Sequence, residues 1–217
     1  MKIKTKGKCI KCGEVCNSTQ AKNHLLGCIT QSASEGYLVR VAWAEQPNLY
    51  WMFIALSKDI SLGKLDQFLR DIWLECCGHL SQFTIGNRRY MSHNESGSPS
   101  QSMKNKVGQL FLPGLKFDYT YDMGSSTELE LEVIENISTP SQNKISLLMR
   151  NDPPIFPCKS CKKTSEIICS LCGDTICTSC SENHSCAVKE EDTYMLMPLV
   201  NSPRAGVCGY EGNNSND

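Results

Sequence analysis

One stretch of the chain constrains its chemistry more than any other: "CKSCKKTSEIICSLCGDTICTSCSENHSC", from Cys158 to Cys186. It holds seven cysteines and one histidine, arranged as three Cys-x-x-Cys pairs and a final His-x-Cys pair. A redox motif needs one Cys-x-x-Cys pair at the start of a helix, whereas these pairs repeat within short loops. Because a tight turn brings both thiolates of such a pair to one ion, the spacing predicts a zinc-binding module.

The donors of this module fill whole coordination shells. Eight side chains make two tetrahedral sites with none left over, and a catalytic zinc normally keeps one position for water. The sites are therefore expected to be structural. Since little apolar material lies between the ligands, zinc should supply most of the module's stability. The predicted ligands are Cys158, Cys161, Cys169, Cys172, Cys177, Cys180, His184 and Cys186.

The ligand spacing resembles the B-box class of cross-braced zinc modules over about thirty residues. The resemblance implies interleaved pairing, in which the first and third pairs hold one ion and the second and fourth pairs hold the other. Sequential pairing, with the first two pairs on one ion, stays open as an alternative.

A second cysteine-rich segment, "CIKCGEVCNSTQAKNHLLGC", precedes the rest of the chain. Cys9 and Cys12 form a knuckle, and "STQAKNHLLGC" predicts a short helix on which His24 and Cys28 share one face. These four residues predict a Cys-Cys-His-Cys zinc finger. Cys16 lies close enough to compete as a ligand. Together with the first module, the sequence predicts three zinc ions.

Lysines surround this finger, and only Glu14 opposes them. A solvated basic tail is the slightly favoured interpretation, and the functional alternative is a finger that contacts the phosphates of a nucleic-acid partner. A single finger rarely provides enough contact for sequence-specific DNA binding. The lysines are Lys2, Lys4, Lys6, Lys8, Lys11 and Lys22.

Composition excludes several classes of protein. Hydrophobic residues make up 40% and charged residues 21% of the 217 residues, which is typical of a folded protein. The net charge of -1 favours neither nucleic acid nor membrane as a partner of the whole chain. The first residues lack the apolar run of a signal peptide, and no apolar stretch is long enough to span a membrane. We therefore expect a cytoplasmic protein, in which clustered cysteines bind metal rather than form disulfides.

The region between the two cysteine-rich segments, 37 to 150, predicts a domain that folds without zinc, because its core needs no ligand cysteine. "YLVRVAWA" alternates like a half-buried strand, and "YWMFIALS" is apolar on both faces like a central strand. "SLGKLDQFLRDIWLE" is an amphipathic helix with Ser61 as a plausible N-cap.

The second half of this region predicts further strands. "HLSQFTIGNRRYM" reads as strand, turn and strand, and "LKFDYTYDMGSSTELELEVIEN" as a hairpin with one face in the core. "SHNESGSPSQSMKNK" is a polar loop that we expect to be mobile, and "NKISLLMRN" adds a last strand. The expected fold is α+β: a mixed or antiparallel sheet with a packed helix, flanked by small zinc-stabilised modules at both ends.

The order of these segments resembles the Ri-plasmid ORF-three-like family, also called the insertion-element TnpR passenger family. The strongest match is "FDYTYDMGSSTELELEV", similar to the family's Tyr-x-Tyr-Asp-Phe-Gly-Asp segment. The chain departs from the family where Trp-Arg-Arg on the second strand is replaced by "WMF", and where Ser125 replaces the aspartate after the glycine. The resemblance covers about half the chain and implies a fold and a link to mobile elements, without a serine-recombinase pattern.

Catalysis is a third class of function to weigh. Asp118, Asp122 and Glu128 surround one hairpin, and His79 begins a nearby strand, so these groups could bind metal or transfer protons. Hairpin carboxylates more often form a solvated face, and Asp122 before Gly124 is typical of a turn. The sequence therefore favours a role without catalysis.

Three further cysteines carry weaker signals. Cys76 and Cys77 at the end of the predicted helix are expected to be small buried hydrophobes. Cys208 has Arg204 close in the sequence, which could activate its thiol, but a docked tail with an incidental thiol is the favoured interpretation.

The sequence thus predicts a zinc-binding interaction protein. Its expected parts are a finger at 1–32, an α+β domain at 37–150, a double-zinc module at 156–188 and a tail at 189–217. The basic finger and the mobile-element resemblance favour a nucleic-acid partner. The near-zero net charge and the B-box spacing favour a protein partner instead. An enzyme that uses Asp118 and Asp122, or Cys208, is the remaining alternative.

Overall fold

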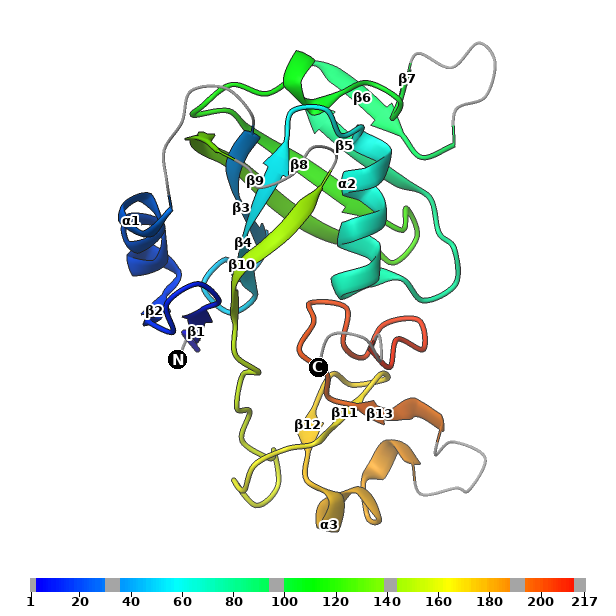
Figure 1. Cartoon of the computed structure of the whole chain (residues 1–217). Helices are drawn as coiled ribbons and strands as arrows, with labels where there is room; N and C mark the ends of the chain where they lie inside the picture. The colour runs from blue at the N-terminus through cyan, green and yellow to red at the C-terminus, as the bar shows by residue number, and fades with distance from the viewer. Residues whose placement is uncertain (1–2, 30–35, 94–99, 139–143, 188–193, 213–217) are drawn as a thin grey trace. The chain divides into compact units, whose positions relative to one another are not determined.

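A ten-stranded sheet dominates the first of two compact units (Figure 1). The computed structural model describes residues 3–29, 36–93, 100–138, 144–187 and 194–212. The first unit comprises residues 1–70 and 79–152, and the second comprises residues 71–78 and 153–217.

The large sheet has the strand order β2-β1-β10-β4-β3-β9-β8-β5-β6-β7. Its neighbouring strands are antiparallel except for β6 and β7, so the fold is α+β with a mixed sheet, as predicted. The strands are β1 (Lys6–Cys9), β2 (Val15–Asn17), β3 (Gly36–Trp43), β4 (Trp51–Ser57), β5 (Ser81–Ile85), β6 (Arg88–Met91), β7 (Gln101–Ser102), β8 (Lys116–Tyr121), β9 (Thr127–Ile137) and β10 (Ile145–Asn151).

Few helices accompany this sheet. They are α1 (Ser18–Cys28), α2 (Leu62–Leu69), the π-helical turn η1 (Arg70–Leu74) and the 3-10 turn η2 (Val107–Gln109). Ser61 is the N-cap of α2, as predicted, and its side chain accepts a hydrogen bond from the amide of Lys64. Among the described residues, we find no helix that combines the length and the apolar character needed to span a membrane.

Several predicted strands are confirmed with their register. Strand β4 is buried at every residue and lies between β10 and β3, as its two apolar faces indicated. Strands β5 and β6 pair around Gly86, which adopts a positive φ of 56°. In the β8–β9 hairpin, Tyr119 pairs with Leu129 on the buried face. Residues 94–99 of the predicted polar loop lie outside the described residues.

One face of the sheet packs against α2, because a buried polar network fixes the helix there. Asp66 of α2 accepts hydrogen bonds from Tyr119 Oη at 2.7 Å, from Ser81 Oγ, and from Arg70 Nε at 2.9 Å. Burial and the nearby Asp66 carboxylate together raise the pKa of Tyr119 well above its usual value. The Asp66 carboxylate thus accepts three hydrogen bonds, and a buried carboxylate requires such partners.

The opposite face of the sheet packs against α1, which corrects the expectation of a half-buried strand. Six of the eight residues of β3 are buried, including Leu38 and Ala42 on the face away from α2. These two share a hydrophobic cluster with Ala21 and Leu25 of α1. Figure 1 shows α1 and α2 on opposite sides of the sheet. The strand is buried on both faces because the finger helix covers the second one.

The N-terminal segment is part of the same sheet and the same core. Strand β1 pairs with β10, and Cys9 belongs to the cluster that contains Trp51. Thr5 Oγ1 accepts a hydrogen bond from Trp51 Nε1 at 2.9 Å, and Asn151 Oδ1 accepts one from the backbone amide of Trp51. The core of the first unit therefore includes the candidate ligand Cys9, whereas we expected residues 37–150 to form a core without any ligand cysteine.

The second unit contains a three-stranded sheet with the order β12-β11-β13. One buried cluster beside this sheet consists of three cysteines and Ile176, and Trp73, Leu74 and Tyr210 of the same unit are also buried. Strand β13 comes from the predicted tail and pairs with β11. The elements are β11 (Ile167–Cys169), β12 (Thr175–Ile176), α3 (Thr178–Ser181), the 3-10 turn η3 (Ser185–Ala187) and β13 (Leu196–Pro198).

If α1 is part of the core of the first unit, Leu25→Ala should lower the free energy of unfolding of that unit by about 2–5 kcal/mol. The side chain is 1% exposed, and its removal leaves a cavity between helix and sheet. Urea unfolding followed by circular dichroism measures the effect. Asn23→Ala, at an exposed position of the same helix, is the control and should stay within about 0.5 kcal/mol. Equal effects of the two substitutions would contradict the shared core.

Candidate metal centres

Three Cys-x-x-Cys pairs adopt the same backbone turn. In the first, the amide of Cys9 donates to the carbonyl of Glu14, and the amide of Gly13 donates back to the carbonyl of Cys9, both at 2.8 Å. Gly13 has a φ of 81°, in the left-handed region that glycine adopts at low cost. The turn directs Cys9 and Cys12 to the same side.

The pairs that begin at Cys158 and Cys169 repeat these hydrogen bonds. The amide of Lys162 donates to the carbonyl of Cys158 at 3.0 Å, and that of Gly173 donates to the carbonyl of Cys169 at 2.8 Å. Lys162 and Gly173 both have positive φ, at 66° and 73°. Local sequence therefore shapes three equivalent knuckles, and only the one at Lys162 lacks a glycine.

The N-terminal centre consists of Cys9, Cys12, His24 and Cys28, whose donor atoms lie within 4.8 Å of one another. Cys12 Sγ and His24 Nε2 are 3.3 Å apart. Helix α1 presents His24 and Cys28 on one face, as the four-residue spacing predicted. A capping box between Asn17 and Gln20 fixes the start of this helix, and with it the direction of both side chains.

Cys16 does not belong to this group. It is 5% exposed and lies in the hydrophobic cluster shared with the sheet. Its thiol is in none of the groups of Cys and His donors that the described residues form. The structure thus places Cys16 in the core and leaves the four predicted residues as the candidate ligands.

The remaining eight predicted residues form two groups in the second unit, each with its donor atoms within 4.8 Å. The grouping is interleaved, as the resemblance to cross-braced modules implied, and not sequential. Cys161 Sγ lies 3.5 Å from Cys177 Sγ, and Cys172 Sγ lies 3.5 Å from His184 Nε2. The second centre is Cys158, Cys161, Cys177 and Cys180, and the third centre is Cys169, Cys172, His184 and Cys186.

The knuckle backbone prepares two of these thiols for metal. Backbone hydrogen bonds from Cys161 and Cys177 lower the pKa of Cys158 to about 6. Burial raises the pKa of Cys169, but backbone hydrogen bonds from Cys172 and Leu171 outweigh it and lower the pKa to about 7. A thiolate is the form that binds soft divalent metals, so each turn stabilises the donor before an ion arrives.

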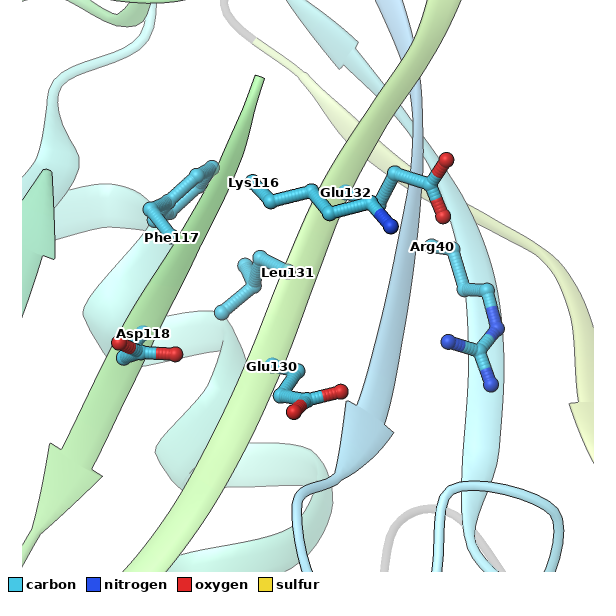
Figure 2. Close-up of a pocket in the computed structure, with 7 residues that line it drawn as sticks. All are labelled: Arg40, Lys116, Phe117, Asp118, Glu130, Leu131 and Glu132. Carbon is cyan, nitrogen blue, oxygen red and sulfur yellow. The ribbon is translucent and has the colours of Figure 1, made fainter. Parts of the chain in front are cut away.

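The hairpin carboxylates are not gathered into one site. Asp118 and Glu130 line a shallow hollow of about 310 Å³ beside Arg40, on the α1 face of the sheet (Figure 2). Asp122 lies four residues after Asp118, which corresponds to about 13 Å along a strand that rises about 3.3 Å per residue. Its Oδ1 accepts hydrogen bonds from the amides of Gly124 and Ser125, as expected of a turn residue.

His79 lies beside Asp122 and not beside Asp118. Its Nε2 is 3.5 Å from Asp122 Oδ2, and its ring meets the edge of Tyr121 at 5.8 Å between ring centroids. His79 and Asp122 thus meet where β8 ends at Tyr121, and Asp122 is 6% exposed. The predicted combination of Asp118, Asp122 and His79 therefore does not form a common site.

A further group of thiols was missed from the sequence. Cys76, Cys77 and Cys208 have their sulfur atoms within 4.8 Å of one another in the second unit. Cys77 is exposed and Cys76 is half-buried, so the expectation that both are buried hydrophobes was wrong. The adjacent pair of cysteines was a signal in the sequence, but its partner lies 131 residues away.

These observations define the class of protein: a sheet-dominated α+β protein whose Cys and His clusters can hold metal ions. The family model described as plasmid pRiA4b ORF-3-like protein matches residues 35–160, more than half of the chain. The chain belongs to this family, which confirms the resemblance seen in its sequence.

Other comparisons add little. No curated protein matches the chain. Among solved structures, it is similar to the protein of unknown function MM3350 from Methanosarcina mazei Go1, with 16% sequence identity and a TM-score of 0.42. That likeness covers 62% of this chain and 68% of the other, and at this TM-score it supports no conclusion.

The knuckles lead to a prediction about Lys162. Lys162→Gly should tighten zinc binding about two- to fivefold, since relief of the left-handed conformation is worth about 1–2 kcal/mol and the extra backbone entropy of glycine offsets about 0.5–1 kcal/mol of it. Gly173→Ala should weaken it by at least as much. Competition with a chromophoric chelator measures both. Lys163→Gly removes the same charge one residue later, where φ is not positive, and should give no gain. A gain equal to that of Lys162→Gly would refute the conformational explanation.

Proposed function

We propose that the protein is a zinc-stabilised binding protein with one structural zinc ion in each of the three centres. The observation that carries this proposal is the grouping of twelve Cys and His side chains into three sets of four. Four protein donors complete a tetrahedral zinc shell and leave no position for a substrate or a reactive water. Thiolate and imidazole are the donors that suit zinc.

The composition of the second unit supports a structural role for the metal. Around the eight candidate ligands, the buried cluster is formed by Cys158, Cys169, Cys177 and Ile176, so apolar packing near them is limited largely to one isoleucine. Structural zinc contributes about 10–16 kcal/mol in isolated fingers. In the N-terminal centre, the metal would also fix α1 on the sheet, because His24 and Cys28 lie on that helix.

Removing one ligand from each centre tests the proposal. Cys12→Ser, Cys161→Ser and Cys172→Ser should each lose one zinc ion per chain relative to the parent, since each side chain belongs to a different group. Elemental analysis of protein never exposed to chelator measures the content. Cys16→Ala, which removes a thiol outside every group, should keep the parent content. A parent with one zinc ion or fewer would refute the three centres.

A row of exposed lysines at the start of β1 supports a phosphate-binding role. Lys4 lies just before the strand and Lys6 and Lys8 lie in it; all three are exposed, whereas Thr5 and Gly7 between them are buried. Alternate residues of a strand point to the same side about 6.6 Å apart, and the alternating exposure continues back to Lys4, so the three side chains form a row on the exposed side. Such a row matches an extended polyanion better than a single small anion, and we propose the backbone of a nucleic acid as the partner.

Two of the predicted lysines make other contacts. Lys22 Nζ pairs with Glu132 Oε1 at 2.9 Å, and Lys11 Nζ donates to the carbonyl of Cys28. Lys2 lies outside the described residues. The proposed contact is therefore the row of Lys4, Lys6 and Lys8. Three phosphate contacts imply weak, non-specific binding, with a dissociation constant of about 10⁻⁴–10⁻⁶ M at physiological salt.

Replacing all three lysines of the row with alanine should weaken binding to mixed oligonucleotides at low salt and reduce the log-log salt slope by about 2–3. Fluorescence anisotropy at several salt concentrations measures both. The matched control replaces the exposed Lys64, Lys104 and Lys144, which removes the same charge elsewhere in the first unit. Zinc content should not change in either variant. If both triple variants behave alike, net charge and not the row explains binding.

A protein partner is the second candidate. Ile10 and Val15 expose 64% and 51% of their surface beside the turn that joins β1 to β2. Exposed apolar side chains on a rigid hairpin are suited to a small protein contact. Absence of any binding to DNA or RNA at low salt would favour this adaptor role over the phosphate-binding role.

A further inference from the structure

The thiols of Cys76, Cys77 and Cys208 lie outside the three centres of the proposed function. Cys77 Sγ is 3.6 Å from Cys208 Sγ and 3.7 Å from Cys76 Sγ. Three thiolates that share a tetrahedral zinc ion lie about 3.8 Å apart, because each sulfur is about 2.3 Å from the ion. The observed separations match that geometry and exceed by far the S–S bond of about 2.05 Å in a disulfide.

The backbone around Cys208 fixes the position of its thiol. Cys208 has a φ of 51°, a left-handed conformation that costs an L-residue about 1–2 kcal/mol. Flanking turns hold it there, since the amide of Val207 donates to the carbonyl of Arg204 and that of Tyr210 to the carbonyl of Val207, both at 3.1 Å. Such strain persists only where the surroundings fix it, and it is often found at binding sites.

The tail that carries Cys208 is docked on the segment that carries Cys76 and Cys77. Ser202 Oγ donates to the carbonyl of Trp73 at 2.6 Å, and the amide of Arg204 donates to Ser202 Oγ at 2.8 Å. Tyr210 is 2% exposed. Both segments belong to the second unit, so packing brings the three thiols together and the cluster is a built feature.

A buried cation lies against these thiols. Arg204 is fully buried, and its Nη2 donates to Cys76 Sγ at 3.5 Å. Three thiolates around a divalent ion carry one net negative charge, whereas three neutral thiols carry none. A metal at this place would therefore set a net negative charge beside the guanidinium, which is a favourable arrangement in a buried environment.

We propose that Cys76, Cys77 and Cys208 bind a fourth zinc ion, which joins the C-terminal tail to the segment after η1. Thiolates are soft ligands that select zinc among the common divalent metals of the cell. Three thiolates leave one position of a tetrahedral zinc shell for a further donor such as water. This site uses none of the twelve residues of the three centres and goes beyond the proposed function.

Zinc stoichiometry of the reduced full-length protein tests the site. Native mass spectrometry of the parent should show four zinc ions, one for each group of donors, and the double variant Cys77→Ser with Cys208→Ser should show three. Cys16→Ala, whose thiol lies outside every group, should keep four. The parent measurement decides the question even if the double variant does not fold.

Three results would overturn the proposal: three zinc ions in the parent, equal zinc content in parent and double variant, or a parent mass lower by two hydrogen atoms that marks a disulfide between these cysteines. A different set of results would refute the proposed function. If Cys12→Ser, Cys161→Ser and Cys172→Ser leave the zinc content unchanged while the double variant loses one ion, the three centres are refuted and the fourth site stands.

Discussion

Strands β3 and β4 of the large sheet are buried on both faces over most of their length, and the first unit is arranged around covering them. Helix α2 covers one face and is fixed there by the buried carboxylate of Asp66. Helix α1 covers the other through Ala21 and Leu25. Since α1 also carries His24 and Cys28, the helix that completes the core also completes a candidate metal centre. Metal binding and sheet stability are therefore expected to be coupled in this protein.

This arrangement explains a departure from the family sequence. Where the family segment has an arginine pair after the tryptophan, this chain has Met52 and Phe53, both fully buried. Phe53 belongs to the cluster under α1, where a guanidinium would be buried without a counter-charge. An apolar side chain at position 53 therefore fits a sheet face that the finger helix covers.

The second unit depends on its knuckles rather than on a hydrophobic core. Each knuckle uses two backbone hydrogen bonds and a left-handed residue to present its thiols, so most of the geometry is set within six residues. The two candidate centres bring together segments whose shared buried cluster contains three cysteines and a single isoleucine. Turns also position the residues of the tail. Arg204, which lies in such a turn, donates a hydrogen bond from its Nη2 to Cys76 Sγ.

Periodicity and spacing determined much of this protein by themselves. The two-residue alternation of β8 and β9, the unbroken apolar run of β4 and the cap at Ser61 were predictable because each depends on neighbours in the chain. So were the twelve candidate ligands, since Cys-x-x-Cys and a four-residue helical spacing are local geometry. Only the tertiary structure decided which pairs share a group, that α1 covers β3, that Lys22 is paired with Glu132, and that Cys208 meets Cys76 and Cys77. These contacts join residues far apart in sequence, and no local pattern encodes which distant partner a side chain will meet.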